Sequence, residues 1–517
     1  LRRAATLRPR HLPTLNNLAF ACLQAGHARE AESAARAALA ADPAHGRARA
    51  NLAHALLRQA AYTRAQIELS RAAQAARDPA LWLELANVRL NLGRAAEALT
   101  AFDQAIALAP PDLAQIESSR LLAMHYDDGL GAAEIFAAHR AWAARHGGVE
   151  ARRPQRRPGS DRALRIGYVS PRLHRSSPAA LLAPVLESHD RQAFEIVCYA
   201  CSHHEDDMTR RMRRAATSWR EAADLDDAQL AELMREDGID IAVDLAGHTP
   251  GHRLGAFALR PAPVAMSWLD YFDTTGLSQI DALVTDRWHS PPGDAQPFTE
   301  ALVRLPGLRF CWEPPADAPE VSAPPSSRGR PFTFGSFNRL AKLSPRALAL
   351  WSEALRAVPG SRLLLKSPSL DNPEEHGPLR ERFQRHGIDP DRIEIRGQSE
   401  HRRMLQEYGD IDVALDSFPY SGCIVTLEAL WMGRPVLALR GSSFVARQSA
   451  AILSCAGQEG LVASDDADFV AKAAGLARDG GALARISGEL RGRVAACGIT
   501  DARAFTRGLE DAYRELW

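Results

Sequence analysis

The sequence lacks net charge, because 63 Lys and Arg residues balance 63 Asp and Glu residues. A chain without a basic excess has no overall electrostatic field with which to hold nucleic acid. It also lacks an apolar run approaching the roughly 18 residues that a membrane helix needs. With 46% hydrophobic and 24% charged residues, the composition is typical of a globular protein. We therefore expect neither a nucleic-acid nor a membrane partner.

Cysteine is scarce, with seven residues at positions 22, 198, 201, 311, 423, 455 and 497. They form no CxxC pair and no Cys/His spacing typical of a metal site. Scattered cysteines of this kind favour a reducing compartment, so a cytoplasmic location is expected. The chain starts at Leu1, inside an apparent helix and without a signal peptide, and we expect the natural protein to extend further upstream.

An internal repeat fills the N-terminal region. Residues 12–43 and 79–110 superimpose without gaps, so that Leu18-Ala19 matches Leu85-Ala86 and Pro43 matches Pro110, and residues 46–77 fit between them. A period of about 34 with small residues at the helix contacts is typical of tetratricopeptide repeats. An Ala-rich bundle without repeats is the weaker alternative. We predict an α-superhelical array with capping helices over residues 1–147, whose concave face binds partner chains.

After an Arg/Pro/Gly-rich linker at residues 148–163, short apolar runs alternate with helical stretches. The expected strands are 164–169, 194–200, 239–245, 264–269 and 282–285, then, after a linker at 313–330, 332–336, 362–366, 392–396, 413–415 and 435–439. This alternation predicts two Rossmann-like α/β domains, at 164–312 and 331–517, that face each other across a cleft. No GxGxxG follows the first strand, which disfavours a dinucleotide site.

Two segments of the second α/β half could bind a phosphorylated ligand. Residues 335–345 follow a strand and lead into a helix expected near Ser344, where backbone N–H groups suit phosphate and Lys342 could neutralise a diphosphate. A surface lysine is the alternative. Residues 410–422 lead into a helix over about 426–432, where Glu428 could accept hydrogen bonds from a ribose diol. A solvated glutamate is the alternative there.

These segments resemble a known family. The chain is similar over essentially its whole length to the O-linked glycosyltransferases that pair tetratricopeptide repeats with a two-Rossmann catalytic core, which include the protein O-GlcNAc transferases and the SPINDLY branch with its bacterial relatives. The matching segments are 165–171 (RIGYVSP), 244–249 (DLAGHT), 260–264 (RPAPV), 274–277 (TTGL), 335–345, 429–433 (ALWMG) and 509–513 (LEDAY).

The resemblance implies a GT-B fold and an inverting transfer of GlcNAc or fucose from a nucleotide sugar to protein Ser/Thr hydroxyls. Lys342 would stabilise the leaving diphosphate, Asn338 would lie beside it, and Glu428 would bind ribose. The segment that would hold diphosphate is Cys423, Ile424, Val425 and Thr426. The donor would be UDP-GlcNAc or GDP-fucose, with no metal or other cofactor. The repeats would bind acceptor proteins and could pair two copies of the chain.

Several positions depart from the family pattern. The residue that replaces the active-site His is Ser176, and His174 is the candidate substitute. The family's Thr run after Gly422 reads Cys-Ile-Val-Thr, which removes side-chain donors to phosphate at a cost of roughly 1.5–3 kcal/mol each. Further replacements are Arg172 for Asp, Asp270-Tyr271-Phe272 for Gly-Tyr-Pro, Met404 for His and Phe444 for His.

Two interpretations follow from these departures. Either the donor site has been rebuilt, or the module has lost turnover and serves as an interaction scaffold. His248 follows an expected strand end, where a site role and a packed structural role are equally favoured. His203 and His204 lie in a polar loop, and we expect them to be solvent-exposed rather than metal ligands.

Overall fold

The structure is a computed structural model that describes residues 1–148, 153–156 and 162–517. Most of the predicted linker at 148–163 lies outside the described residues. The chain divides into two compact units, each built from two separate stretches of sequence. Unit 1 comprises residues 1–128 and 331–404, and unit 2 comprises residues 129–330 and 405–517. The predicted domain boundaries stay predictions.

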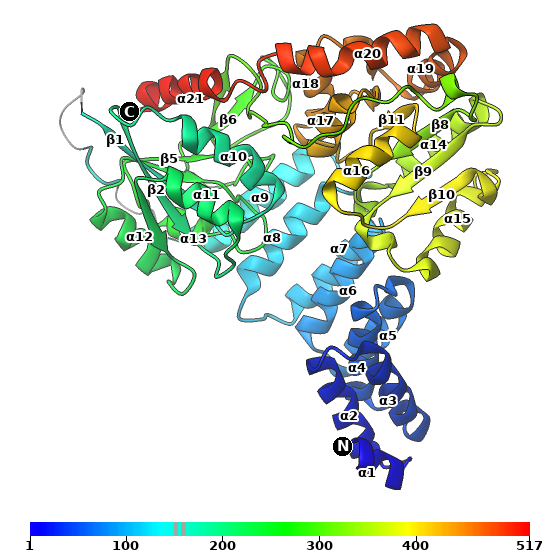
Figure 1. Cartoon of the computed structure of the whole chain (residues 1–517). Helices are drawn as coiled ribbons and strands as arrows, with labels where there is room; N and C mark the ends of the chain where they lie inside the picture. Colours follow the sequence, from blue (N-terminus) through cyan, green and yellow to red (C-terminus); the bar gives the residue numbers. More distant parts are fainter. Residues whose placement is uncertain (149–152, 157–161) are drawn as a thin grey trace. The chain divides into compact units, whose positions relative to one another are not determined.

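The N-terminal region consists of antiparallel helix pairs, as the repeat predicts (Figure 1). Each of the three predicted repeats, 12–43, 46–77 and 79–110, contains one pair. The helices are α1 (Arg2–Leu7), α2 (Leu12–Gln24), α3 (Ala28–Ala41), α4 (Gly46–Arg58), α5 (Tyr62–Ala76), α6 (Pro79–Asn91), α7 (Ala95–Ala107) and α8 (Leu113–Met124). Asp78 caps α6 by accepting a hydrogen bond from the Ala80 N–H, and Pro79 occupies the first turn, where its missing N–H costs nothing.

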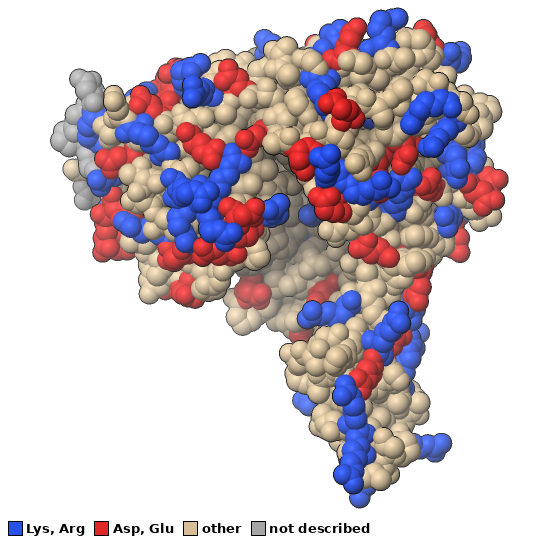
Figure 2. Space-filling view, viewed as in Figure 1, with Lys and Arg blue, Asp and Glu red and all other residues tan. Residues whose placement is uncertain are grey.

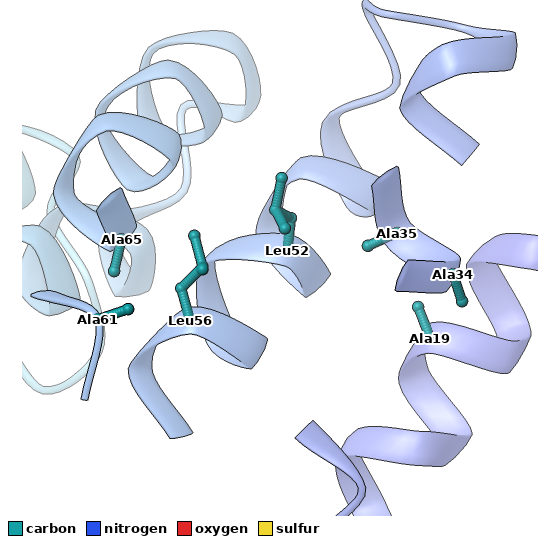
Figure 3. Close-up of a cluster of buried hydrophobic side chains, with 7 residues drawn as sticks. All are labelled: Ala19, Ala34, Ala35, Leu52, Leu56, Ala61 and Ala65. Carbon is teal, nitrogen blue, oxygen red and sulfur yellow. The ribbon is translucent and has the colours of Figure 1, made fainter. Parts of the chain in front are cut away.

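Small side chains allow the repeat helices to approach closely. Figure 3 shows one buried cluster, in which Leu52 and Leu56 of α4 lie among alanines of the neighbouring helices and of the turn before α5. The alanines are Ala19, Ala34, Ala35, Ala61 and Ala65. The side chain of each is a single methyl group, so the helix backbones can approach closely. This packing explains why an Ala-rich sequence forms a stable array.

Helix α9 (Ala132–His146) differs from the prediction. The apolar spacing predicts a helix that caps the array, but α9 belongs to unit 2. It packs against Tyr271 and Gly276 of the first α/β half. The His139 ring accepts or donates a hydrogen bond at 2.7 Å to the Tyr271 hydroxyl, and Gly276 lies so close that a Cβ there would stand 2.4 Å from the His139 carbonyl oxygen. The Trp142 side chain is likewise buried. Helix α9 is therefore part of the first α/β half.

The first sheet has seven parallel strands in the order β3-β2-β1-β4-β5-β6-β7. The strands are β1 (Leu164–Ser170), β2 (Phe194–Ala200), β3 (Ser218–Glu221), β4 (Ile241–Asp244), β5 (Val264–Ser267), β6 (Ala282–Asp286) and β7 (Ala301–Leu305). The helices are α10 (Ser177–Ser188), α11 (Asp207–Ala215), α12 (Asp227–Glu236) and α13 (Leu254–Ala258). The terminal helix α21 (Ala502–Leu516) also packs here, with the Tyr513 and Tyr168 hydroxyls 2.7 Å apart.

The second parallel sheet has the order β10-β9-β8-β11-β12-β13. Its strands are β8 (Thr333–Ser336), β9 (Arg362–Lys366), β10 (Ile393–Arg396), β11 (Val413–Leu415), β12 (Val436–Leu439) and β13 (Val462–Ala463). The helices are α14 (Pro345–Ala357), α15 (His376–Gln384), α16 (His401–Glu407), α17 (Ile424–Trp431), α18 (Gln448–Cys455), α19 (Asp466–Arg478) and α20 (Gly480–Ala496). The predicted fold class, a repeat array followed by two parallel α/β domains, is confirmed.

Basic and acidic side chains are interspersed over the face shown in Figure 2, in keeping with the balanced composition. Within the described part of the chain, no helix is both long enough and apolar enough to cross a membrane.

Candidate functional site

The segment around Lys342 lies in unit 1, on the predicted turn from strand to helix. Strand β8 ends at Ser336, a short 3-10 turn spans Leu340–Lys342, and α14 begins at Pro345. Ser344 caps α14 by accepting a hydrogen bond from the Ala347 N–H at 3.1 Å, which fixes the start of the helix. Asn338 and Lys342 are half-buried. The strand, the turn and the cap together hold the Lys342 backbone in one conformation.

The repeat array packs directly on this segment. Gly93 lies in the turn between α6 and α7 with φ +71°, and a Cβ there would stand 2.8 Å from the Leu343 carbonyl oxygen and 2.9 Å from that of Leu340. The half-buried Arg382 guanidinium donates to the carbonyl oxygens of both Leu92 and Leu343 at 3.1 Å. Burial lowers the pKa of Arg382 to about 10. Unit 1 therefore joins the last matched repeat to the Lys342 segment, a connection that the sequence analysis did not anticipate.

The predicted diphosphate-holding segment begins α17 in unit 2. The helix starts at Ile424, and Cys423 occupies the N-cap position without a side-chain capping bond. The first-turn N–H groups of a helix have no intrahelical acceptor, so an anion is favoured at this end. The Thr426 hydroxyl lies 2.7 Å from the Ser449 hydroxyl of α18. Glu428 is 5% exposed, so it is not the solvated glutamate of the alternative interpretation.

A buried arginine, Arg309, lies near this helix start, and sequence reasoning missed it. It is 2% exposed, and its Nη2 donates to the Leu269 carbonyl oxygen at 2.8 Å. Burial lowers the pKa of Arg309, whereas the nearby Asp286, Cys423, Asp270 and Tyr420 oppose that shift. Among the described residues, its Nε is a buried polar atom with no hydrogen-bond partner. Arg309 is thus a buried cation near Cys423, and its Nε–H is available to donate a further hydrogen bond.

His289 and Arg309 both contact the Phe444 ring. The Phe444 ring centroid is 5.0 Å from that of His289 and 4.9 Å from the Arg309 guanidinium. The Asp286 carboxylate at the end of β6 receives the His289 Nδ1–H at 2.7 Å. Burial tends to raise the pKa of Asp286, but the His289 charge and the N–H donors outweigh it and lower the pKa to about 2. The His289 Nε2 is buried without a partner among the described residues.

Two of the departures from the family pattern form one ion pair. Arg172 replaces Asp and Asp270 replaces Gly, and the Arg172 Nη1 lies 2.9 Å from the Asp270 Oδ2. Burial raises the pKa of Asp270, and the Arg172 charge opposes the shift. The two substitutions compensate each other, because either one alone would leave a buried or half-buried charge without this partner.

The remaining departures are packed side chains. Phe272 lies edge-on to the Tyr420 ring at 4.6 Å, and Phe444 is fully buried. The Phe444 N–H donates to the Gln296 side-chain oxygen at 2.6 Å. Met404 is half-buried on α16 in unit 1. Each ring therefore fills a defined position in the core of unit 2.

Ser176, at the position of the family's active-site His, and the nearby His174 both make local contacts. The Ser176 hydroxyl donates to the Arg172 carbonyl oxygen at 3.1 Å and accepts from the Ala179 N–H at 3.3 Å, so it caps α10. The His174 ring lies 4.5 Å from the His204 ring. The structure thus gives Ser176 a capping role and places His174 against His204.

His248 is a packed, hydrogen-bonded histidine. It follows β4, is fully buried and donates from Nε2 to the Thr275 carbonyl oxygen at 2.9 Å. Its ring contacts Trp142 at 4.6 Å and His139 at 5.0 Å, both on α9. The Asp244 carboxylate holds the start of the same loop by accepting from the Gly247 N–H at 2.8 Å. These contacts favour the structural interpretation of His248 over a site role.

The order of elements defines a class of protein: a tetratricopeptide array followed by two parallel-sheet α/β domains of the GT-B type. Comparison with known families agrees with this class. The model described as glycosyl transferase family 41 matches residues 149–313 and 330–509, and a tetratricopeptide-repeat model matches residues 79–112. The chain belongs to glycosyl transferase family 41.

Individual relatives are named as glycosyltransferases as well. The chain is 36% identical to a probable UDP-N-acetylglucosamine–peptide N-acetylglucosaminyltransferase SPINDLY of Oryza sativa subsp. japonica, over 79% of this chain and 45% of that protein. The Arabidopsis thaliana SPINDLY protein is 34% identical over the same shares. The chain thus spans less than half the length of these relatives. A solved structure of a mutant Thermobaculum terrenum O-GlcNAc transferase is 36% identical, with TM-score 0.87, over 100% of this chain and 98% of that one.

Proposed function

We propose that this protein is an inverting glycosyltransferase that moves GlcNAc or fucose from a nucleotide sugar to Ser/Thr hydroxyls of proteins bound by the repeats. The observation that carries the proposal is the Lys342 segment, which keeps the family sequence on a capped turn from strand to helix. Lys342 would stabilise the diphosphate as it leaves, and Asn338 would lie beside it. A fixed cation aimed at developing charge lowers the barrier without reorganisation at the moment of reaction.

In unit 2, the donor diphosphate would be held at the start of α17 by Cys423, Ile424, Val425 and Thr426, and Glu428 would bind the ribose. The Thr426 N–H donates to the Cys423 carbonyl oxygen at 3.0 Å, so the backbone donors would be those of Cys423, Ile424 and Val425. Arg309 would take over the charge stabilisation that the missing Thr hydroxyls supply elsewhere in the family. Its burial near Cys423 and its unpartnered Nε support this role. A guanidinium supplies a full positive charge and planar N–H donors, which suit phosphate oxygens.

One observation favours a second candidate function, that of a catalytically silent scaffold. Ser176 is committed to capping α10, and His174 lies against His204. A chain without the active-site imidazole could keep the fold and the repeats while losing turnover. Binding of acceptor proteins by the array would then be its whole activity.

A donor-release assay separates the two functions. Purified protein is incubated with UDP-GlcNAc or GDP-fucose and a library of Ser/Thr peptides, and release of the nucleoside diphosphate is measured. Transfer predicts peptide-dependent release from one donor and its loss, by at least 100-fold, in Lys342→Ala, because that variant removes the charge that the leaving group needs. Lys472→Ala is the matched control, since that residue pairs with Asp468 on α19. Unchanged release in Lys342→Ala would contradict the assigned role, and no release from either donor would favour the scaffold.

A further inference from the structure

Two histidines occupy equivalent places at the ends of neighbouring strands in unit 2. Strands β1 and β2 are parallel, and their register pairs Ser170 with Ala200 as the last residues of each. His174 comes four residues after Ser170, and His204 comes four residues after Ala200. The carboxyl ends of parallel strands meet at one edge of a sheet, the edge at which open α/β sheets bind ligands. The register thus brings the two imidazoles together.

A carboxylate completes the cluster. The ligand atoms of His174, His204 and Asp206 all lie within 4.8 Å of one another, and the His204 Nε2 is 3.7 Å from the Asp206 Oδ2. In a tetrahedral site with metal–nitrogen distances near 2.0–2.1 Å, ligand atoms stand about 3.3 Å apart. Both imidazoles are at least partly exposed, so small side-chain rotations close that difference.

The surroundings hold two of these groups in place. Asp206 Oδ1 accepts from the Thr209 N–H at 3.0 Å, and Oδ2 accepts from the Arg175 N–H at 2.7 Å. These backbone donors fix the orientation of the carboxylate. The His174 ring hydrogen-bonds the backbone of Arg175. Metal-ligating histidines commonly use their second nitrogen in this way, and ligating carboxylates are likewise held by outer hydrogen bonds.

Contrary to the expectation from the sequence for His204, we propose that His174, His204 and Asp206 form a binding site for a divalent transition-metal ion such as Zn²⁺. Two imidazoles and one carboxylate are a ligand set suited to zinc, and three protein ligands leave a fourth position for water or another small ligand. His204 also lines a pocket of 220 Å³ that includes Glu205, Glu221 and Asp224. The ion would tie the loop that carries Ser176 to the start of α11.

Metal titration of the untagged, chelator-treated protein tests the site, with Zn²⁺ in calorimetry and Co²⁺ in visible absorption spectroscopy. We expect one Zn²⁺ per chain with micromolar or tighter affinity, and a Co²⁺ spectrum of tetrahedral type. His174→Ala and His204→Ala should each weaken binding at least 10-fold. Asp206→Asn should weaken it as well while keeping α11 capped, because Asn is an equally good N-cap.

His203→Ala is the matched control, because His203 is adjacent to His204 but its Nε2 lies 3.0 Å from Asp224. This variant should bind Zn²⁺ as the wild type does. Absence of binding at 100 µM Zn²⁺ would overturn the proposal. So would equal affinity in wild type, His174→Ala and His204→Ala, which would mean that the metal binds elsewhere. All the substituted side chains are exposed or half-buried, so circular dichroism should confirm that every variant remains folded.

Discussion

The Lys342 segment of unit 1 and the loops of unit 2 that carry Arg172, Asp270 and Phe444 differ in how far they keep the family sequence. The first keeps the family sequence and is held by Ser344 and by the repeat turn at Gly93. The second carries most of the departures, among them Arg172, Asp270 and Phe444. Yet these departures have partners in the structure, because Arg172 pairs with Asp270 and the Phe444 ring contacts both His289 and Arg309. The comparison favours a donor site that has been rebuilt over one that has decayed.

The Arg172–Asp270 pair tests most strongly whether the departures in unit 2 compensate one another. Arg172→Ala should destabilise the protein by about 2–3 kcal/mol, which is less than the 3–5 kcal/mol of a fully buried pair because the Arg172 side chain is 32% exposed. The double variant Arg172→Ala/Asp270→Gly should recover most of that loss, since no buried charge is left. Chemical denaturation of the wild type, both single variants and the double variant gives the coupling energy. Additive effects would mean that the two substitutions did not arise as a unit.

The contribution of the contact between the repeats and the Lys342 segment to stability can be measured with two equivalent glycines. Gly26 and Gly93 occupy the same turn in two matched repeats, at φ +77° and +71°. Gly93→Ala should cost about 2 kcal/mol more than Gly26→Ala, because only at Gly93 does a Cβ meet other atoms, the carbonyl oxygens of Leu340 and Leu343. Thermal unfolding of both variants measures the difference. Equal losses would show that the turn strain alone matters and that the contact does not hold the segment.

A separate effect is expected in the pH dependence of the stability of unit 2. Burial raises the pKa of Asp273 to about 7, although the Thr274 N–H and the Gln296 side chain oppose it. The folded state therefore keeps a proton that the unfolded state loses near its ordinary pKa of 3.8. Stability from this group is present below pH 4 and is lost as the pH rises to 7, by up to about 1.4 kcal/mol per pH unit. Asp273→Asn should flatten that slope in denaturation measured from pH 4 to 8, and an unchanged slope would refute the assignment.

Much of the fold could be predicted from the sequence, because the repeat period and the apolar runs of buried strands are visible in it. All ten expected strands are present, within two residues at most of their ends. The strands that were missed, β3, β7 and β13, lie at sheet edges, where half-exposed sequences such as Ser218–Glu221 lack the continuous apolar run of a central strand. For helix α9, the apolar spacing indicates that one face of the helix is buried. It does not indicate which part of the chain covers that face.

The candidate site was less accessible to sequence reasoning. Lys342 and Glu428 could be singled out from their places after strands. Arg309 could not, since an arginine before an apolar run carries no signal until the fold brings it near Cys423. The Arg172–Asp270 pair was likewise invisible, because two departures separated by 98 residues read as independent losses. For His248 the sequence favours a site role and a structural role equally, and only its contacts with α9 favour the structural role.

Calorimetric titration with UDP and with GDP, in the wild type and in Arg309→Met, tests the rebuilt donor site most directly. Met keeps much of the arginine's apolar length while removing its charge. The account predicts saturable binding of one nucleotide, weakened 10- to 100-fold in Arg309→Met, with a folded variant by circular dichroism. Binding of neither nucleotide at millimolar concentration, or equal affinity in the folded variant, would contradict it.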